Sequence, residues 1–217
     1  MKAAALAACG LALVLAACGT PPRERFYTLM PDDAPVPATQ AAAPPLPAVP
    51  PSAGQPPAPR RPALQPPALQ RVALGPLTLP ESLRRPQLVM RLGERLEVYE
   101  QRRWIQPLDA EIADALAERL GRRLAAPVAT LRQAAAAGAT RRIALDVRRF
   151  ESTPAMASLD VLWSIADGLG KRLADGRTEA RQPCADGGEA ALIAAHGANL
   201  DRLAAELAQA LATLPAE

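Results

Sequence analysis

Histidine and cysteine are the residues of this chain that could support catalytic or metal chemistry, and both are scarce. The 217-residue sequence holds one histidine, His196, and three cysteines, Cys9, Cys18 and Cys184. A zinc site of the usual His and Cys composition cannot be assembled from so few ligands. A hydrolase would need a nucleophile beside His196, and no Gly-x-Ser-x-Gly elbow is present to supply one. We therefore expect no metal, no cofactor and no enzymatic activity, with His196 packed on the apolar side of a helix and Cys184 in a loop.

Cys18 lies in the one setting that predicts covalent chemistry. Lys2 is followed by an apolar run over residues 3–17, and the tripeptide Leu-Ala-Ala directly precedes the cysteine. A cation, a short apolar stretch and small residues before a cut site are typical of a secretory signal peptide. The run is shorter than the ~20 residues that a membrane-spanning helix needs. The pattern therefore predicts a cleaved signal peptide over residues 1–17.

The ending Leu-Ala-Ala-Cys resembles the lipobox of bacterial lipoproteins. That resemblance implies cleavage before Cys18, a diacylglyceryl thioether on its sulfur and an acyl chain on its new amino group. Two or more acyl chains make a stable membrane anchor, whereas one alone binds only marginally. The alternative is an ordinary secretory signal in which Cys18 is incidental. With Cys18 lipidated, only Cys184 would remain as a thiol, so we expect no intramolecular disulfide.

Arginine supplies nearly all of the positive charge. The formal net charge is +3 at pH 7, and arginine pairs recur at residues 84–85, 102–103, 122–123, 141–142 and 148–149. Such pairs could form a basic surface for anionic lipid head groups. The simpler explanation is a biased base composition, because Ala, Arg, Pro, Leu and Gly are all abundant. Acidic residues separate the pairs and no aromatic residues are interleaved with them, so we expect no nucleic-acid partner.

Proline dominates residues 31–69, where 14 of the 24 prolines occur. Apolar residues do not recur at helix or strand spacing in this segment, so we expect it to be disordered or polyproline-like. It could be a tether between the lipid and a folded domain. The aromatic and β-branched run at residues 25–29 favours another interpretation, in which residues 18–30 hold the lipidated end and a first strand of the domain. Closing so long a loop instead of a short one costs only about 2 kcal/mol more.

The remaining residues, 70–217, alternate predicted strands and helices. Strands are predicted at 71–77, 87–92, 95–100, 142–150 and 159–165, with a weaker one at 177–182. Helices are predicted at 109–125, with Asp109 as the N-cap, and at 189–214. The second helix carries an apolar stripe of Leu192, His196, Leu200, Leu203, Leu207 and Leu211. We therefore predict an α+β fold: a mostly antiparallel sheet with two main helices packed on one face, plus the disordered Pro/Ala-rich insertion.

Two segments combine prolines, arginines and a tryptophan around a predicted strand start and a predicted helix start. They are residues 79–89 (LPESLRRPQLV) and 102–108 (RRWIQPL). One interpretation is that they only set the direction of the strand and the helix that follow. The other is a docking site, with the candidate residues Pro80, Arg85, Pro86, Gln87, Arg103, Trp104, Pro107 and Leu108.

Together with Phe-Tyr-Thr-Leu at residues 26–29 and Val-x-Leu-Gly-Pro-Leu at 72–77, these segments resemble the ABC-type transport auxiliary lipoprotein family, also called PqiC-like. The resemblance implies a lipoprotein that works beside MCE-domain proteins, which form lipid-conducting tubes anchored in the inner membrane. Gly19 and Thr20 lack the aspartate that retains lipoproteins there, so we expect the periplasmic face of the outer membrane. The expected role is to dock the MCE protein and assist lipid transfer between the two membranes.

Two further expectations remain hypotheses at this point. Several copies of the chain could form a homo-oligomeric ring that matches the rotational symmetry of a tube. The alternative function is a structural or pilot lipoprotein that assembles an outer-membrane complex without carrying lipid.

Overall fold

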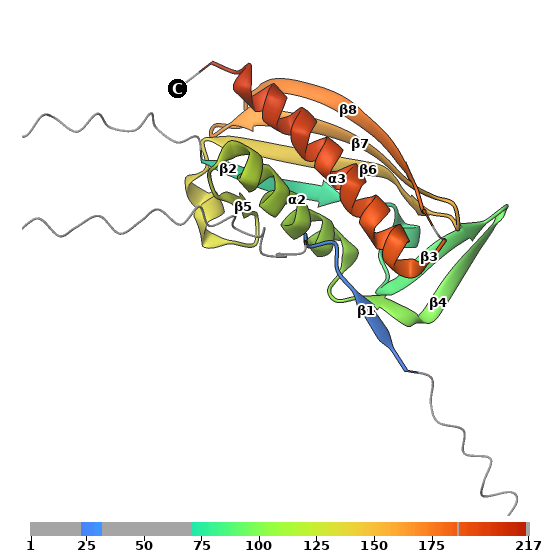
Figure 1. The fold of residues 1–217 in the computed structure, drawn as a ribbon. Coiled ribbons are helices and arrows are strands. Elements are labelled where there is room, and N and C mark those ends of the chain that lie inside the picture. Colours follow the sequence, from blue (N-terminus) through green and yellow to red (C-terminus); the bar gives the residue numbers. More distant parts are fainter. Residues whose placement is uncertain (1–22, 32–70, 186, 216–217) are drawn as a thin grey trace, which may run out of the picture.

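The structure is a computed structural model that describes residues 23–31, 71–185 and 187–215 (Figure 1). The predicted signal peptide, Cys18 and residues 32–70 of the proline-rich segment lie outside the described residues. The strands are β1 (Arg25–Tyr27), β2 (Val72–Thr78), β3 (Gln87–Leu92), β4 (Arg95–Trp104), β5 (Val128–Thr130), β6 (Arg141–Ser152), β7 (Met156–Asp167) and β8 (Arg172–Pro183). The helices are α2 (Leu108–Leu124) and α3 (Glu189–Ala212), with short 3-10 turns η1 (Glu81–Leu83) and η2 (Ala134–Gly138).

The larger of two sheets has five strands in the order β5-β2-β6-β7-β8. Strands β6, β7 and β8 form long antiparallel ladders, whereas β2 pairs in parallel with both β5 and β6. Parallel neighbours need a crossover, and the β3–β4 hairpin and α2 provide it between β2 and β5. Both helices cover one face of this sheet (Figure 1). The predicted α+β fold is confirmed, and its sheet is mixed because the short strands β2 and β5 add parallel pairings.

A second sheet has three strands in the order β1-β4-β3. Strands β3 and β4 form the predicted hairpin and turn at Gly93, whose φ of +63° is a left-handed conformation that glycine adopts freely. Strand β1 runs parallel to the end of β4, with Tyr27 opposite Trp104. The strand expected near residues 25–29 is therefore present and pairs with the domain. It belongs to a small sheet rather than to the edge of the main one.

The apolar stripes predicted for the helices form the core between them and the larger sheet. The six stripe residues of α3 are each at most 2% exposed. In α2, Ile112, Leu116 and Leu120 are at most 1% exposed. Buried residues occupy every second position over the first seven residues of β6, as expected for a strand with one face on the core.

The start of α2 differs from the prediction, since Asp109 is not its N-cap. The helix begins at Leu108, and Pro107 holds the N-cap position without a side-chain cap. The proline ring fixes an extended entry into the helix, which leaves Asp109 inside the first turn, where its charge favours the helix dipole. The helix ends as Ala125 adopts a left-handed φ of 49° and donates its N–H to the carbonyl of Gly121.

Candidate docking site

A pocket of about 690 Å³ lies where the end of β2, the loop from η1 to β3 and the β4–α2 junction meet. We call it the motif pocket. Its apolar lining consists of Leu77, Leu79, Pro86, Trp104, Ile105, Pro107 and Leu108, and its polar lining of Arg84, Arg85, Gln106 and Asp109. Five of the eight predicted docking residues therefore meet here: Arg85, Pro86, Trp104, Pro107 and Leu108.

The other three predicted docking residues lie outside the motif pocket. Pro80 directly precedes η1 and lines a smaller hollow beside β6. The Gln87 side chain donates to Glu100 Oε2 over 3.0 Å, across the β3–β4 hairpin. Arg103 Nη2 lies 3.2 Å from Glu24 Oε1. These three residues support the chain around the pocket instead of forming its wall.

One backbone hydrogen bond joins the two motif segments. The N–H of Trp104 donates to the carbonyl of Pro86 over 2.8 Å. This bond lies just beyond an irregularity in the β3–β4 ladder, between Gln87 and Leu88. Residues 79–89 and 102–108, which are separate in the sequence, are thereby brought to one place.

Trp104 connects the motif pocket with the core. Its side chain is 5% exposed, and its ring meets Phe150 edge-on, with 6.2 Å between ring centroids. Phe150 in turn stacks on the imidazole of His196, with 4.0 Å between centroids. A continuous row of rings therefore runs from the pocket to α3 and holds the pocket wall against the core.

His196 is fully buried, as its position on the apolar stripe predicted. Its Nε2 atom forms a 2.9 Å hydrogen bond with Ser152 Oγ, and burial lowers its pKa to about 3. Within the described residues its Nδ1 atom has no hydrogen-bond partner. Among the residues that the structure describes, no carboxylate bonds to Nδ1 as in a Ser-His-Asp arrangement, and the hydrogen bond with Ser152 is buried.

Two arginines and one exposed apolar side chain flank the pocket. The Arg84 side chain is 57% exposed and lies 3.5 Å from Glu81, and Arg85 is also exposed. Ile105, next to Trp104 in the chain, is 64% exposed. An apolar interior beside two cations suits a protein partner that offers an apolar side chain near an anionic group.

Two charged residues of α2 fasten the N-terminal segment, and the sequence analysis missed both. Glu111 Oε1 accepts hydrogen bonds from the Thr28 hydroxyl over 2.5 Å and from the Leu29 N–H over 2.6 Å. Arg119 Nη1 donates to the Leu29 carbonyl over 2.8 Å. Glu111 is 0% exposed and Arg119 is 7% exposed. The signal that could have revealed them is their place on the buried side of the helix, where a charge without a partner is costly.

Glu189, at the start of α3, fastens β1 and β4 in a similar way. It accepts a hydrogen bond from the Tyr27 hydroxyl and lies 3.2 Å from Arg25 Nη1 and 2.8 Å from Arg102 Nε. The Tyr27 hydrogen bond, helped by Arg25 and Arg102, holds the pKa of Glu189 below its ordinary value, against the opposing effect of burial. The segment that follows the predicted lipid attachment is thus bound to both helices.

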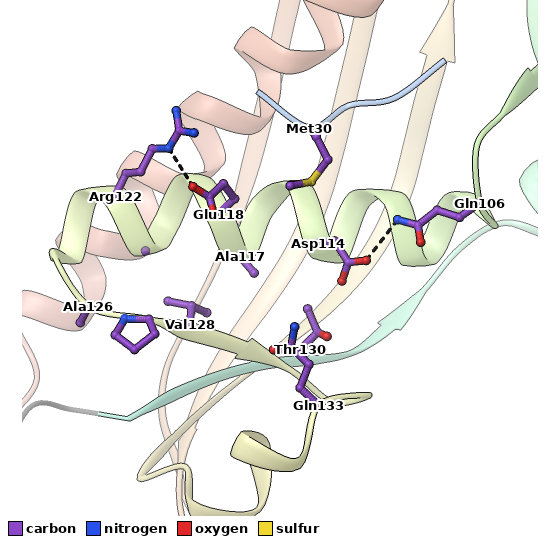
Figure 2. A pocket seen from close by; sticks show the side chains of 12 residues that line it. Met30, Gln106, Asp114, Ala117, Glu118, Arg122, Ala126, Val128, Thr130 and Gln133 are labelled. Atoms are coloured by element: carbon purple, nitrogen blue, oxygen red, sulfur yellow. Dashed lines mark hydrogen bonds and ion pairs between the residues drawn. The ribbon is translucent and has the colours of Figure 1, made fainter. Parts of the chain in front are cut away.

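A second pocket, of about 800 Å³, lies between α2 and β5 (Figure 2). Two pairs of its charged and polar side chains contact each other. Arg122 Nε lies 2.9 Å from Glu118 Oε1, and Gln106 donates to Asp114 over 3.1 Å, as the dashed lines in Figure 2 show. None of the predicted docking residues lines this pocket, although Gln106 borders both pockets.

In residues 23–31, 71–185 and 187–215, no three His, Cys, Asp or Glu side chains gather in a way that could hold a metal ion. No helix of this part of the chain has the length and apolar character needed to cross a membrane.

Fold and pocket define a small α+β domain whose sequence motifs meet at one surface. The family model described as "ABC-type transport auxiliary lipoprotein component" matches residues 52–208, which is most of the chain. The protein therefore belongs to the ABC-type transport auxiliary lipoprotein family, as the motif resemblance predicted.

Solved structures show the same fold. A crystal structure titled only as an uncharacterized protein is similar with a TM-score of 0.57 and 14% identity, covering 66% of this chain and 93% of the other. Protein XCC0632 from Xanthomonas campestris, of family DUF330, is similar with a TM-score of 0.53 and 21% identity, covering 64% of this chain and 81% of that one. No curated protein sequence matches this chain.

Proposed function

We propose that this protein is an outer-membrane lipoprotein that docks an MCE-type transport system through the motif pocket and assists lipid transfer between the two membranes. The observation that carries the proposal is the convergence of both motif segments on that pocket. Membership of a transport auxiliary family supports a transport system as the class of partner.

The position of β1 supports a docking site close to the membrane. If Cys18 carries the lipid, the five residues from there to Arg23 can span at most ~18 Å. Arg23 lies two residues before the paired segment of β1 and β4, and the Ile105 N–H donates to the Tyr27 carbonyl over 3.0 Å. Ile105 also lines the motif pocket. A partner seated in the pocket would therefore meet the domain beside its anchored end.

Photo-cross-linking tests the docking step. A photoreactive amino acid in place of the exposed Arg85 should cross-link to the MCE-domain protein when both are present in the membrane. The matched control is the same residue in place of Leu169, which is 98% exposed and lies in the β7–β8 turn. Equal yields at the two positions, or no MCE adduct at Arg85, would overturn the proposal. An adduct with another outer-membrane assembly alone would favour the structural or pilot role.

The proposed homo-oligomeric ring has a separate test. Mass photometry of the acylated protein, alone and with its MCE partner, should give a species of several copies. A monomer under both conditions would contradict the ring hypothesis and leave the docking proposal intact.

A further inference from the structure

The outer face of the β1–β4 pair exposes two large apolar side chains. In the parallel register Phe26 lies opposite Arg103 and Tyr27 opposite Trp104. Because side chains alternate along a strand, Tyr27 and Trp104 point into the domain while Phe26, Arg103 and Ile105 share the outer face. Phe26 is 58% exposed and Ile105 is 64% exposed. We call this surface the β1–β4 face.

This face lies at the end of the domain where the lipid would be attached. Arg23, the first described residue, is five residues after Cys18, and β1 begins two residues later at Arg25, so the strand starts within ~25 Å of an anchored cysteine. The opposite end of the domain is marked by Leu169, because the neighbouring Gly168 lies against Ala139 and Thr140. Helix α3 runs between these ends, and its 24 residues measure roughly 36 Å.

The two ends of α3 establish that separation. Glu189, at its start, bonds to Tyr27 and Arg102 of the small sheet. Pro215, just past its end, accepts a hydrogen bond from Arg141, which follows Thr140. Figure 1 shows the same arrangement, with β1 and the β3–β4 hairpin at the end of the domain away from the C-terminus.

Positive charge adjoins the β1–β4 face. Arg23, Arg25 and Arg102 line a hollow together with Glu24 and Gln101. Arg25 and Arg102 pair with Glu189, and Arg103 pairs with Glu24, so four arginines here are accompanied by two carboxylates. The Arg25 side chain is 67% exposed even though it is paired with Glu189. Exposed arginines beside apolar side chains match the border between phosphate groups and acyl chains in a phospholipid layer.

We propose that the β1–β4 face rests on the phospholipid surface in which the protein is anchored. Phe26 and Ile105 enter the interfacial region, and Arg103 on the same face, together with Arg23 ahead of β1, lies at the level of the lipid phosphates. The inference uses the lipid anchor of the proposed function and is independent of the transport partner. Because Ile105 also lines the motif pocket, the pocket would then open at the lipid surface, where a transferred lipid could enter or leave.

Spin labelling of the full-length acylated protein tests this contact. Single cysteines at Phe26, Ile105 or Leu169 are labelled in a Cys184→Ser background, and the protein is reconstituted in vesicles of phosphatidylethanolamine and phosphatidylglycerol. Acylation of Cys18 is verified by mass spectrometry, which separates a failed anchor from a failed contact. The readout is the accessibility of each label to lipid-soluble oxygen and to a water-soluble nickel complex.

Labels at Phe26 and Ile105 should collide more often with oxygen than with the nickel complex, and the label at Leu169 should show the reverse preference. If the labels at 26 and 105 are as accessible to nickel as the label at 169 while Cys18 is acylated, the contact does not exist. If they become shielded only when an MCE-domain protein is added, the β1–β4 face binds that protein and the membrane contact is likewise excluded.

Discussion

The two sheets of this domain are held in different ways. In the five-stranded sheet, β6 buries six of its twelve residues, and the apolar stripe of α3 packs over the neighbouring strands. In the three-stranded sheet, β4 buries only Trp104 among its ten residues. Hydrogen bonds and ion pairs from Glu111, Arg119 and Glu189 fasten β1 and the residues after it.

The two sheets therefore differ in what they contribute to stability and to the proposed binding of a partner. The larger sheet and its helices bury most of the apolar surface, so they supply most of the free energy of folding. The smaller sheet carries the β1–β4 face, where apolar side chains remain exposed, and the end of β4 contributes Trp104 to the wall of the motif pocket. Substitutions in the first region should therefore unfold the protein, whereas those in the second should leave it folded and change what it binds.

The largest effect is expected in the core under α3. Leu203 is 0% exposed, and Leu203→Ala should lower the free energy of unfolding by roughly 2–5 kcal/mol because a cavity replaces buried methyl groups. Urea unfolding followed by circular dichroism measures this loss. Leu169→Ala, at a 98% exposed position, is the control and should change stability by less than about 0.5 kcal/mol. Equal losses would contradict the assignment of α3 to the main core.

The next-largest loss of stability is expected where α2 holds the N-terminal segment. Glu111→Ala leaves the buried Leu29 N–H without its acceptor, which should cost about 1–3 kcal/mol. The loss should be local to the small sheet, so hydrogen exchange should rise at Leu29 and in β1 more than in β6. Glu118→Ala is the control on the same helix, because Glu118 pairs with Arg122 at the surface. Uniform exchange throughout the domain would show that the two sheets form one cooperative unit.

His196 lies at the junction of the two regions, and its burial should make the free energy of unfolding depend on pH. Folded His196 has a pKa of about 3, against 6.5 for the free side chain. Between these values the unfolded chain binds the proton and the folded chain does not, so stability falls as pH falls, by about 2 kcal/mol from this group at pH 5. Urea unfolding at pH 7 and pH 5 should show this fall in the wild type and a smaller one in His196→Gln. The same fall in both proteins would mean that other groups cause it.

The smallest effect on stability is expected on the β1–β4 face. Ile105→Ser replaces a side chain that is 64% exposed, so the free energy of unfolding should change by less than about 0.5 kcal/mol. Cross-linking from the Arg85 position to the MCE-domain protein should nevertheless decrease, because Ile105 forms part of the pocket wall. Unchanged cross-linking would confine recognition to the arginine side of the pocket.

Most long elements could be predicted because their side chains show a clear period. The α3 stripe, the alternation on β6 and the turn at Gly93 are all visible in the sequence and present in the structure. Strand β5 was missed because three residues are too few to show a period. Strand β8 extends over Arg172–Pro183, well beyond the predicted 177–182, because charged residues on this edge strand conceal its alternation.

The candidate site was predicted in part for a similar reason. Residue types and spacing pointed to both motif segments, and five of the eight residues chosen from them line the motif pocket. Spacing could not separate Pro86 and Trp104, which form the pocket, from Gln87 and Arg103, which support it. That distinction depends on an irregularity in the β3–β4 ladder and on which strand faces are covered.

By itself, the sequence determined the α+β class, the long helices and strands, the family and the two motif segments that contain the candidate docking residues. These follow from local chemistry: side-chain period, turn residues and short motifs act between neighbours in the chain. Only the tertiary structure decided that β1 joins a separate small sheet, that Glu111 and Glu189 hold it, and that Phe26 and Ile105 share an exposed face. These contacts join residues far apart in the chain, and their partners are chosen by the packing of the whole domain.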